Sequence, residues 1–553
     1  MKDFNYRRRM TSVVNVGGVG IGGDNPVRVQ SMTNTSTMDT DGSVAQCKAI
    51  AMAGGDIVRL TAQGVREADN IGEIRRRLRE AGIDVPLVAD IHFNPKAAFA
   101  AASQVEKVRI NPGNFVDPGR TFRHLEYTDE EYARELERLD EAVTPFLELC
   151  RENSTAIRIG VNHGSLSDRI MSRYGDTPAG MVESAMEFLR ICRERDFNDV
   201  VISIKASNVT VMVETVRLLV KAMDDEGMSF PLHLGVTEAG DGEDGRVKSA
   251  VGIGALLAEG IGDTIRVSLS EPPENEIPVA KSLVEYISSF AYAPALPDVE
   301  TVSRERQPMR TPVVVGAHKK SDYSRDAVPD LFADCDDTLA VDAACWSESI
   351  GMIMDNPEIP VVLTSRHPNP AAELLVALNG LVAAGVTNPL LPHIVYAGIN
   401  ADDVRLRAAA DFGRIFLNGF TDGMWVEGDA LTDDELSRLS FGILQAVRLR
   451  ISRTEYIACP GCGRTLFDLQ STLKAVKDAT SHLKGLKIGV MGCIVNGPGE
   501  MADADYGYVG AGVGRITLYK GKVPVERNIP AEEAIPRLVA FLKAEGVWRE
   551  KEA

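Results

Sequence analysis

Short apolar runs alternate with longer amphipathic stretches through the first half of the chain. Apolar runs typical of buried strands occur at residues 27–32, 56–61, 86–92, 106–111, 156–162, 200–205, 231–238 and 263–268. Between them, apolar positions recur with helical spacing at residues 65–81, 130–151, 179–195, 209–226 and 246–259. Eight strands that alternate with helices predict an α/β protein with an N-terminal (β/α)8 TIM barrel.

The pattern changes after residue 290. Proline-rich stretches at 291–298 and 304–312 predict a linker, and a second strand–helix region follows. Its expected strands are 313–316, 360–364 and 394–397, and its expected helices are 370–384, 401–412 and 432–451, the last opened by a capping box from Thr432 to Glu435. Cys335 and Cys345 lack metal-ligand spacing, so we expect both to be small buried side chains. This region carries no chemistry of its own and is predicted to be structural, as a spacer or an interface.

A third region begins at residue 453. It combines expected helices at 466–483 and 531–545 with expected strands at 486–491 and 514–519, which is typical of a small α+β domain. A chain of 553 residues is too long for one hydrophobic core. We therefore predict three domains: a TIM barrel at 1–290, an α/β insert at 291–452 and a C-terminal α+β domain at 453–553.

The charge balance narrows the choice of partners. Lys and Arg number 60 against 79 Asp and Glu, a net charge of −19, which argues against nucleic acid or an anionic membrane as the main partner. No apolar run approaches the roughly 20 residues of a membrane span, and the basic N-terminus lacks the apolar stretch of a signal peptide. We therefore expect a cytoplasmic protein whose 8 cysteines are reduced and available to a metal.

Polar residues lie within or just after the predicted barrel strands. They are Arg59, Asp90, His92, Arg109, Asn111, Arg158, Asn162, Lys205, His233, Glu238, Arg266 and Ser268. The C-terminal ends of barrel strands meet at one rim, where substrates bind. Arginine and lysine at that rim suit a phosphorylated ligand, because guanidinium groups bind phosphate oxygens in pairs. The alternative is that these cations only pair with carboxylates around the rim.

Three cysteines mark the third region. Cys459-Pro-Gly-Cys462 by itself is compatible with a redox dithiol, half a zinc site or part of an iron–sulfur site. Cys493 follows in a glycine-rich loop, and no histidine comes after it to complete a zinc site, so iron–sulfur is favoured. Three thiolates leave one iron of a [4Fe–4S] cluster open to a weaker ligand or a substrate. Glu500 is a candidate for that place, because a carboxylate is a hard and exchangeable ligand.

Three other features have two interpretations each. Glu238 follows a buried strand, so it is either a general acid with a raised pKa or a partner of a rim cation. Asp90 and His92 either bind a metal or shuttle protons, or else His92 only forms a hydrogen bond at the rim. The glycines between Gly18 and Gly23 match a dinucleotide motif, but Pro26 disfavours the helix that would hold a pyrophosphate. We expect a turn between two short strands there.

The motifs together identify a resemblance that covers residues from about 10 to 290 and from about 453 to 510. The chain resembles the 4-hydroxy-3-methylbut-2-en-1-yl diphosphate synthase family of the methylerythritol phosphate pathway, in its long form with an inserted middle domain. The resemblance lies in Val29-Gln-Ser-Met-Thr-Asn-Thr, Pro86-Leu-Val-Ala-Asp-Ile-His-Phe, Arg109-Ile-Asn-Pro-Gly-Asn, Ile157-Arg-Ile-Gly-Val-Asn, Pro231-Leu-His-Leu-Gly-Val-Thr-Glu-Ala-Gly, Gly262-Asp-Thr-Ile-Arg-Val-Ser-Leu, Ala458-Cys-Pro-Gly-Cys-Gly-Arg and Gly492-Cys-Ile-Val-Asn-Gly-Pro-Gly-Glu.

This resemblance implies a reductive opening of 2-C-methyl-D-erythritol 2,4-cyclodiphosphate in isoprenoid biosynthesis. It implies a [4Fe–4S] cluster held by Cys459, Cys462, Cys493 and Glu500, and Glu238 as proton donor. The residues expected to hold the substrate are Arg59, Asp90, His92, Arg109, Arg158, Asn162, Lys205, Arg266 and Ser268. Ferredoxin or flavodoxin is expected to supply electrons, and a homodimer is left open. The alternatives from other classes are an electron carrier or cluster-delivery protein, which leaves the rim cations without a role, and a zinc hydrolase.

Overall fold

The computed structural model describes residues 4–116, 126–301, 312–315, 338–419, 421–494, 497–501 and 503–551. The chain divides into two compact units. Unit 1 comprises Met1–Arg8, Arg246–Ile261 and Ser282–Ser452, and unit 2 comprises Arg9–Gly245, Gly262–Lys281 and Arg453–Ala553. The strands of the first and third predicted domains therefore belong to unit 2, and each unit is described below by itself.

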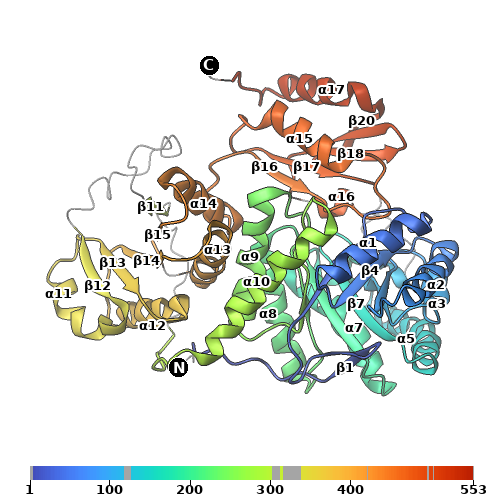
Figure 1. Cartoon of the computed structure of the whole chain (residues 1–553), viewed down its shortest axis with the longest axis horizontal. Helices are drawn as coiled ribbons and strands as arrows, with labels where there is room; N and C mark the ends of the chain where they lie inside the picture. The colour runs from blue at the N-terminus through green and yellow to red at the C-terminus, as the bar shows by residue number, and fades with distance from the viewer. Residues whose placement is uncertain are drawn as a thin grey trace. The chain divides into compact units, whose positions relative to one another are not determined.

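Eight parallel strands form the barrel of unit 2 (Figure 1). They are β3 (Arg28–Met32), β4 (Ile57–Thr61), β5 (Leu87–Asp90), β6 (Lys107–Ile110), β7 (Ala156–Asn162), β8 (Val200–Lys205), β9 (His233–Leu234) and β10 (Thr264–Ile265). Their order is β8-β7-β6-β5-β4-β3-β10-β9, and a parallel bridge between Ile202 and Leu232 joins the two ends. The predicted (β/α)8 barrel is confirmed, with β9 and β10 much shorter than the apolar runs suggested.

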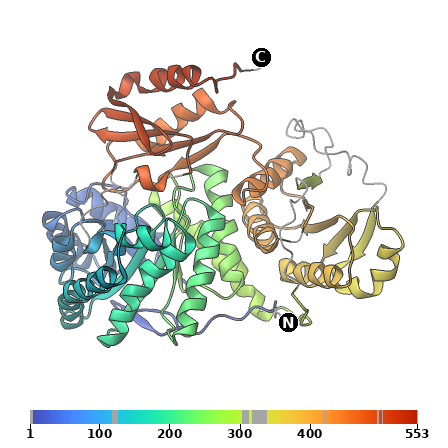
Figure 2. The ribbon, with the colours of Figure 1, turned by 180° about the vertical axis from the view of Figure 1, so that it is seen from behind.

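Helices follow the barrel strands along the chain, and the view from behind shows helices on the outside of the sheet (Figure 2). Those of unit 2 are α1 (Thr40–Met52), α2 (Val65–Glu80), α3 (Pro95–Ala101), α4 (Pro112–Phe115), α5 (Asp129–Glu152), α6 (Asp168–Tyr174), α7 (Pro178–Glu194) and α8 (Val209–Asp225), with the 3-10 turn η1 (Pro273–Asn275). Helices α9 (Gly242–Ala258) and α10 (Glu276–Ser288) begin in unit 2 and continue into unit 1, which also contains the 3-10 turn η2 (Ser289–Tyr292). Polar N-caps start several of them: Asp39, Asn94 and Asn208 each accept a backbone N–H of the first turn. None of the helices in the described ranges has the length and apolar character of a membrane crossing.

A short hairpin packs against the N-terminal end of the barrel. Strands β1 (Val14–Val16) and β2 (Val19–Ile21) pair antiparallel around Gly17 and Gly18, whose φ angles of 58° and 90° suit a two-residue hairpin turn. Their buried side chains pack against Ile57, Val88, Ala156 and Val201 of the barrel strands. We call this apolar group the barrel floor. The expected turn between two strands is present, although β2 occupies part of the glycine motif, and β3 rather than a helix follows Pro26.

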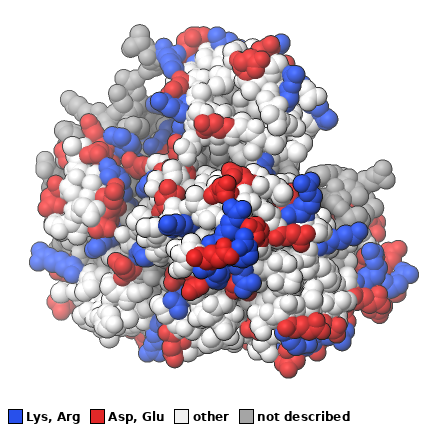
Figure 3. All heavy atoms as spheres, turned by 45° about the vertical axis from the view of Figure 1, so that its right-hand side comes forward, with Lys and Arg blue, Asp and Glu red and all other residues white. Residues whose placement is uncertain are grey.

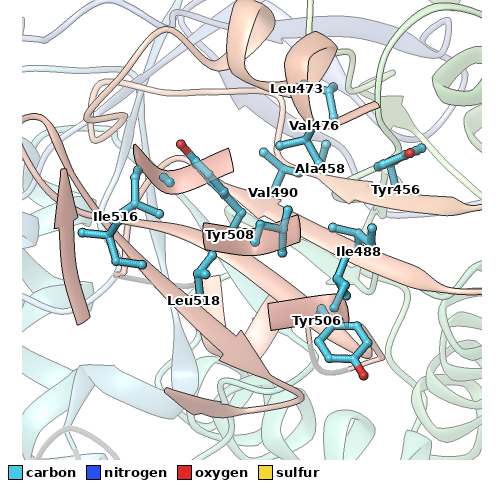
Figure 4. Close-up of a cluster of buried hydrophobic side chains, with 14 of the residues drawn as sticks. Tyr456, Ala458, Leu473, Val476, Ile488, Val490, Tyr506, Tyr508, Ile516 and Leu518 are labelled. Carbon is cyan, nitrogen blue, oxygen red and sulfur yellow. The ribbon is translucent and has the colours of Figure 1, made fainter. Parts of the chain in front are cut away.

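The C-terminal part of unit 2 is a five-stranded mixed sheet. Strands β16 (Glu455–Ala458), β17 (Lys487–Met491) and β18 (Tyr506–Gly512) are parallel, and β19 (Arg515–Lys520) and β20 (Val523–Pro530) continue the sheet antiparallel. The helices are α15 (Leu469–Thr480), α16 (Gly497–Glu500) and α17 (Ala531–Ala544). Apolar side chains from β16 to β19 meet Leu473 and Val476 of α15 in the core (Figure 4). The α+β prediction for this region is confirmed, although β16, β18 and β20 were not predicted.

Unit 1 contains a parallel five-stranded sheet in the order β11-β15-β14-β13-β12. Its strands are β11 (Val313–Val315), β12 (Leu339–Asp342), β13 (Val361–Ser365), β14 (Leu390–Tyr396) and β15 (Gly423–Gly428), and its helices are η5 (Ala343–Ser349), α11 (Ile350–Met354), α12 (Pro370–Ala383), α13 (Ala401–Asn418) and α14 (Asp433–Ala446). The capping box of Thr432 and Glu435 is present. The role of this insert and the boundaries at 290 and 452 remain predictions.

One cysteine prediction in the insert is wrong. Cys345 is exposed, because it lies at a kink inside η5 where its backbone leaves helical geometry, with φ of −111° and ψ of 21°. Cys335, most of the 304–312 linker and Gly316 lie outside the described residues. A cysteine's preference for burial is therefore a poor guide inside a short irregular segment.

Candidate active site

One pocket in unit 2 collects nearly all the predicted site residues. It encloses about 710 Å³ of space between atoms, part of it open to solvent. From the barrel it is lined by Met32, Arg59, Asp90, Arg109, Arg158, Asn162, Lys205, Thr237, Glu238, Arg266 and Ser268, and from the C-terminal sheet by Cys459, Cys462, Arg464, Thr465, Cys493 and Glu500 among others. Of the predicted residues, only His92 is absent from this lining.

Strand register explains why the polar side chains of β5, β6 and β7 meet. Asp90 is paired with Arg109, and Arg109 is paired with Arg158, across three adjacent parallel strands. Paired residues of neighbouring strands point to the same face, so these three side chains lie side by side inside the barrel. The next pair toward the rim is Asn162 with Lys205, between β7 and β8. Residues far apart in the sequence are thereby gathered at the C-terminal ends of the strands.

Asp90 is the central anion of this group. Its carboxylate oxygens lie 3.1 Å from Arg109 Nη1, 3.8 Å from Arg158 Nη2 and 3.4 Å from Arg464 Nη2. Burial by itself would raise the pKa of Asp90, but Arg59, Arg109, Arg464 and Arg158 outweigh it and hold the pKa well below its usual range. Asp90 is therefore ionised, and it organises the arginines around it.

Both terminal nitrogens of Arg109 are engaged by the protein, while its Nε has no hydrogen-bond partner in the described structure. Besides Asp90, Arg109 donates to the Gly160 carbonyl at 2.9 Å, to Asn162 Oδ1 at 2.6 Å and to His92 Nδ1 at 3.1 Å. A Cβ at position 160 would lie 2.4 Å from Arg109 Nε, so glycine is needed there. Burial, then the charges of Arg109 and Arg464, lower the pKa of His92 well below its usual value. His92 is thus a neutral acceptor behind Arg109, and it reaches the pocket only through that arginine.

Three cations have few partners or none. Arg59 donates to Met32 Sδ at 3.0 and 2.9 Å, and neither Arg59 nor Lys205 forms an ion pair within the described ranges. Arg158 Nε and Nη1 have no hydrogen-bond partner in the described structure. Burial and then repulsion from Arg59 lower the pKa values of Arg158 and Lys205 well below their usual range. Buried cations crowded in this way favour the binding of an anion, which would offset their mutual repulsion.

Arg266 differs from these three cations, because it pairs with a carboxylate, as the alternative interpretation of the rim cations predicted. Its Nε and Nη2 each lie 2.9 Å from a carboxylate oxygen of Glu276, at the start of α10. Burial lowers the pKa of Arg266, but Glu276 more than compensates and raises it. Ser268 is buried beside it, and its hydroxyl has no hydrogen-bond partner among the residues described. Arg266 thus contributes mainly a neutral ion pair to the wall of the pocket.

Glu238 combines burial with backbone strain. It is 3% exposed, its φ is 52°, and its Oε2 has no hydrogen-bond partner in the described part of the chain. Burial, and then the nearby carboxylate of Glu500, raise the pKa of Glu238 well above its ordinary value. A left-handed backbone at a non-glycine residue is unfavourable and is typical of functional positions. The neighbouring Ala239 forms a parallel bridge with Ala458, which ties this segment to β16.

The cysteines follow the carboxyl ends of two adjacent parallel strands. Cys459 comes directly after β16, Cys493 follows β17, and Cys462 lies in the loop between β16 and α15. The Gly492 N–H donates to Cys459 Sγ at 3.3 Å, and Arg464 Nε donates to Cys462 Sγ at 3.4 Å. The φ of Gly461 is 82°, which favours glycine between the two cysteines. At the opposite wall, Asn162 Nδ2 donates to Glu500 Oε1 at 2.9 Å.

This donor set fits an iron–sulfur cluster better than a single ion. In the described structure, no three His, Cys, Asp or Glu side chains converge closely enough to hold one metal ion. Each cysteine of a [4Fe–4S] cluster binds a different iron, so its ligands surround a space instead of meeting at a point. Cys459, Cys462, Cys493 and Glu500 line such a space. Glycines at 461, 492 and 497 line it too, which lets the backbone approach closely.

Several pocket residues were not predicted as site residues. Arg464 is the most informative, because it contacts both Cys462 and Asp90. Its position two residues after Cys462 was a usable signal, since basic residues beside thiolates stabilise them. Met32, Thr237 and Thr465 also line the pocket. They carry no charge, and only the register of the folded strands reveals them.

Charge on the outer surface is mixed. On the face in Figure 3, acidic and basic side chains are interspersed, and they form no broad basic area there. The cationic excess described above lies inside the pocket. The fold and the pocket together are typical of a (β/α)8-barrel enzyme, with a pocket rich in cations that suits a small anion and with three cysteines at the mouth of the barrel.

Comparisons with known proteins identify the family. The model of the GcpE TIM-barrel domain matches residues 11–281, and that of the GcpE protein C-terminal domain matches residues 455–544. A 4-hydroxy-3-methylbut-2-en-1-yl diphosphate synthase (flavodoxin) from Bacteroides fragilis is 54% identical, over 99% of this chain and 97% of that protein. Proteins of the same name from Akkermansia muciniphila and Protochlamydia amoebophila are 46% and 41% identical over at least 97% of each protein. The chain belongs to the 4-hydroxy-3-methylbut-2-en-1-yl diphosphate synthase family.

Solved structures add little to this assignment. A dihydropteroate synthase from Xanthomonas albilineans covers 51% of this chain and 99% of its own, with a TM-score of 0.33 and 14% identity. A 3-dehydroquinate dehydratase from Geobacillus kaustophilus covers 52% of this chain and 100% of its own, with a TM-score of 0.32 and 10% identity.

Proposed function

We propose that the pocket of unit 2 is the active site at which this chain converts 2-C-methyl-D-erythritol 2,4-cyclodiphosphate to 4-hydroxy-3-methylbut-2-enyl diphosphate. In this reaction two electrons enter, the C2–O bond to the diphosphate breaks, and the C3 hydroxyl leaves. A double bond forms between C2 and C3, and the hydroxyl takes a proton and departs as water. The observation that carries the proposal is a set of buried, under-partnered cations in the same pocket as three cysteines and two carboxyl groups.

The first role of the chain is to hold the cyclic diphosphate. Arg59, Arg158 and Lys205 are the cations with the least internal pairing, so we assign the phosphate oxygens to them. Arg109, fixed by Asp90, Asn162 and His92, keeps the wall rigid. Arg266 and Ser268 complete the wall beside them. Guanidinium groups suit this task because they remain charged and bind two oxygens at once.

The second role is to hold a [4Fe–4S] cluster, for which Cys459, Cys462, Cys493 and Glu500 are the proposed ligands. When bound there, the cluster would supply the two electrons singly and offer an exchangeable coordination position. Asn162 orients the Glu500 carboxylate through its 2.9 Å hydrogen bond, and the Gly492 N–H and Arg464 stabilise negative charge on the sulfurs. These contacts are the part of the chemistry that the chain itself provides.

The third role is to supply a proton. Glu238 is assigned to it because it lines the pocket and its buried Oε2 has no hydrogen-bond partner among the described side chains. Burial favours the protonated form of a carboxyl group. We assign the proton on Glu238 to the departing hydroxyl, which leaves as water. Loops of the C-terminal sheet line the mouth of the pocket, part of which is open to solvent.

The remaining partners follow from chemistry and from the relatives. The relatives named above are flavodoxin-dependent, so we propose flavodoxin as the electron donor, with ferredoxin as the alternative. The barrel and the C-terminal sheet of the same chain both line the pocket, so we propose that one chain is sufficient to form the site, whether or not a homodimer forms. We also propose that the protein works in the cytoplasm.

The decisive experiment is anaerobic purification with iron and sulfide analysis, followed by turnover of the cyclic diphosphate with reduced flavodoxin. We expect a brown protein with about four irons per chain. Glu238→Gln is expected to keep the cluster absorbance and lose turnover by about two orders of magnitude or more, which is a typical contribution of a general acid. A colourless, iron-free protein with full activity would refute the proposal, and so would a fully active Glu238→Gln variant.

A further inference from the structure

A second level of polar side chains lies inside the barrel, closer to the N-terminal ends of the strands than the pocket. It includes Gln30 on β3, Lys107 on β6, Ser203 on β8 and His233 on β9, each at most 1% exposed. Each has at least one side-chain nitrogen or oxygen without a hydrogen-bond partner in the described structure. Because side chains alternate along a strand, Lys107 shares its face with Arg109, two residues further on. We call these four residues the lower polar level.

Lys107 is the charged residue of this level, and the proposed mechanism gives it no role. Its register partners are Val88 on β5 and Ala156 on β7, which both belong to the barrel floor. The apolar stem of Lys107 therefore starts among the floor residues, and its ammonium must extend away from them, as long basic side chains commonly do. Lys107 is 0% exposed, and its Nζ has no partner among the described residues.

The groups that face Lys107 from the surrounding strands do not balance its charge. Arg158 on β7 and Arg59 on β4 repel it, and His233 on β9 is held neutral by burial and by the cations near it, Lys107 included. Asp90, the carboxylate of this region, lies at the level of Arg109 and contacts the arginines. Burial, then Arg158 and Arg59, lower the pKa of Lys107 to about 7. Lys107 thus holds its proton much less tightly than a solvent-exposed lysine does.

We propose that Lys107 is a positioning residue of the diphosphate site, which takes up a proton as the anion binds and then adds its charge beneath Arg158. The inference rests on the proposed function, because the anion is the cyclic diphosphate. An anion bound to Arg59 and Arg158 offsets the electrostatic repulsion that those arginines exert on Lys107. The proton passes from solvent to the lone pair of Nζ, and no bond of the substrate is made or broken. Affinity should therefore fall as pH rises above the value at which free Lys107 loses its proton.

The test is calorimetric titration of the anaerobic holoenzyme with 2-C-methyl-D-erythritol 2,4-cyclodiphosphate, without an electron donor. Titrations at about pH 8 in two buffers of different ionisation enthalpy give the number of protons taken up. We expect the wild-type protein to take up roughly half a proton or more, since its free lysine is mostly neutral at that pH. Lys107→Met should lose this uptake. If anion binding raises the pKa of Lys107 by about one unit, the variant should bind about twofold more weakly than the wild type at about pH 8 and about tenfold more weakly at about pH 6, where the wild-type lysine is protonated in both states.

Two further variants separate this role from a structural one. Ser203→Ala alters the same lower polar level without changing its charge, so it should keep the wild-type proton uptake. Lys107→Met removes an unbalanced buried charge, so its melting temperature should equal or exceed that of the wild type. If Lys107→Met does not fold, Lys107→Gln replaces it. The proton uptake of the wild-type protein on binding tests the inference without any variant.

Each remaining result is decisive. The inference is overturned if the wild type binds without proton uptake, or if the Lys107 variants keep that uptake. It is also overturned if these variants only lower the melting temperature and leave affinity unchanged. If the wild-type holoenzyme does not bind the cyclic diphosphate at all, the proposed function fails, and this inference falls with it.

Discussion

Asn162 on β7 donates from Nδ2 to Glu500 Oε1 at 2.9 Å, and its Oδ1 accepts from Arg109 at 2.6 Å. One amide thus connects a barrel arginine to a proposed cluster ligand of the C-terminal sheet. A side-chain amide suits this role, because it has donor hydrogens on one atom and an acceptor oxygen on the other. These two hydrogen bonds join the proposed anion-binding wall of the pocket to the proposed metal-binding wall.

Asn162→Asp should therefore impair the enzyme more than its small change in shape suggests. The new carboxylate still accepts from Arg109, but it repels Glu500 where a donor is needed. We expect kcat/KM to fall about 10- to 100-fold, the range for a lost charged hydrogen bond of about 1.5–3 kcal/mol. Steady-state kinetics of the anaerobic enzyme measure this, and iron content shows whether the cluster is retained. Equal activity of Asn162→Asp and wild type would mean that the amide has no such role.

Arg464 should influence the redox behaviour of the bound cluster. Its guanidinium donates to Cys462 Sγ at 3.4 Å and lies 3.4 Å from Asp90. Hydrogen bonds to cluster sulfurs stabilise the more negative, reduced state and raise the reduction potential. Arg464→Gln should lower the potential measured in an EPR-monitored titration and slow turnover. The matched control is Arg515→Gln, which changes a charge in the same domain at an exposed residue outside the pocket lining. A potential unchanged in Arg464→Gln, or lowered equally in both variants, would contradict the prediction.

Gly499 should be required for closure of the C-terminal loops over the barrel mouth. A Cβ at this position would lie 2.9 Å from the backbone oxygen of Gly164, which follows β7. Gly499→Ala should therefore hold the two backbones apart and lower kcat by about tenfold or more, since small misplacements near a reacting centre have effects of up to about 100-fold. Gly512→Ala is the control, because its nearest atom would be an Arg515 side-chain carbon at 3.9 Å. The same kcat in both variants would show that this close approach is dispensable.

Asp411 in the insert should make stability depend on pH. Tyr286 and Tyr396 donate to its Oδ2 at 2.6 and 2.8 Å, and Arg414 and Arg407 lie near it. Burial raises the pKa of Asp411 to about 6, although these tyrosines and arginines oppose the rise. The folded protein then binds more protons than the unfolded chain, so the contribution of Asp411 to stability is full at low pH and is lost as pH rises through about 6.

Asp411→Asn should remove this dependence. Relative to the variant, the wild type should lose at most about 3 kcal/mol between about pH 4 and about pH 6, the value of about two pKa units. Differential scanning calorimetry of both proteins across this range measures the difference. A constant difference in melting temperature at every pH would exclude a titrating Asp411.

The sequence was sufficient to predict the barrel and most of the pocket. Apolar runs located the strands, and the rule that strand ends meet at one rim placed Asp90, Arg109 and Arg158 together. The sequence could not show that Glu276, ten residues after Arg266, neutralises that arginine, because this ion pair depends on how α10 packs back toward the sheet. For the same reason, it could not show that His92 lies behind Arg109 and not in the pocket lining. Strand β18 was missed because its glycines hide the apolar alternation, and β20 because it is a largely exposed edge.

The hairpin of β1 and β2 has a consequence for the catalytic cycle. Because its side chains pack into the N-terminal end of the barrel, neither substrate nor product can pass through that end. Both must cross the opposite end, where loops of the C-terminal sheet line the pocket. A viscous solvent slows this passage but not bond breaking, so raising solvent viscosity should show which of the two limits turnover.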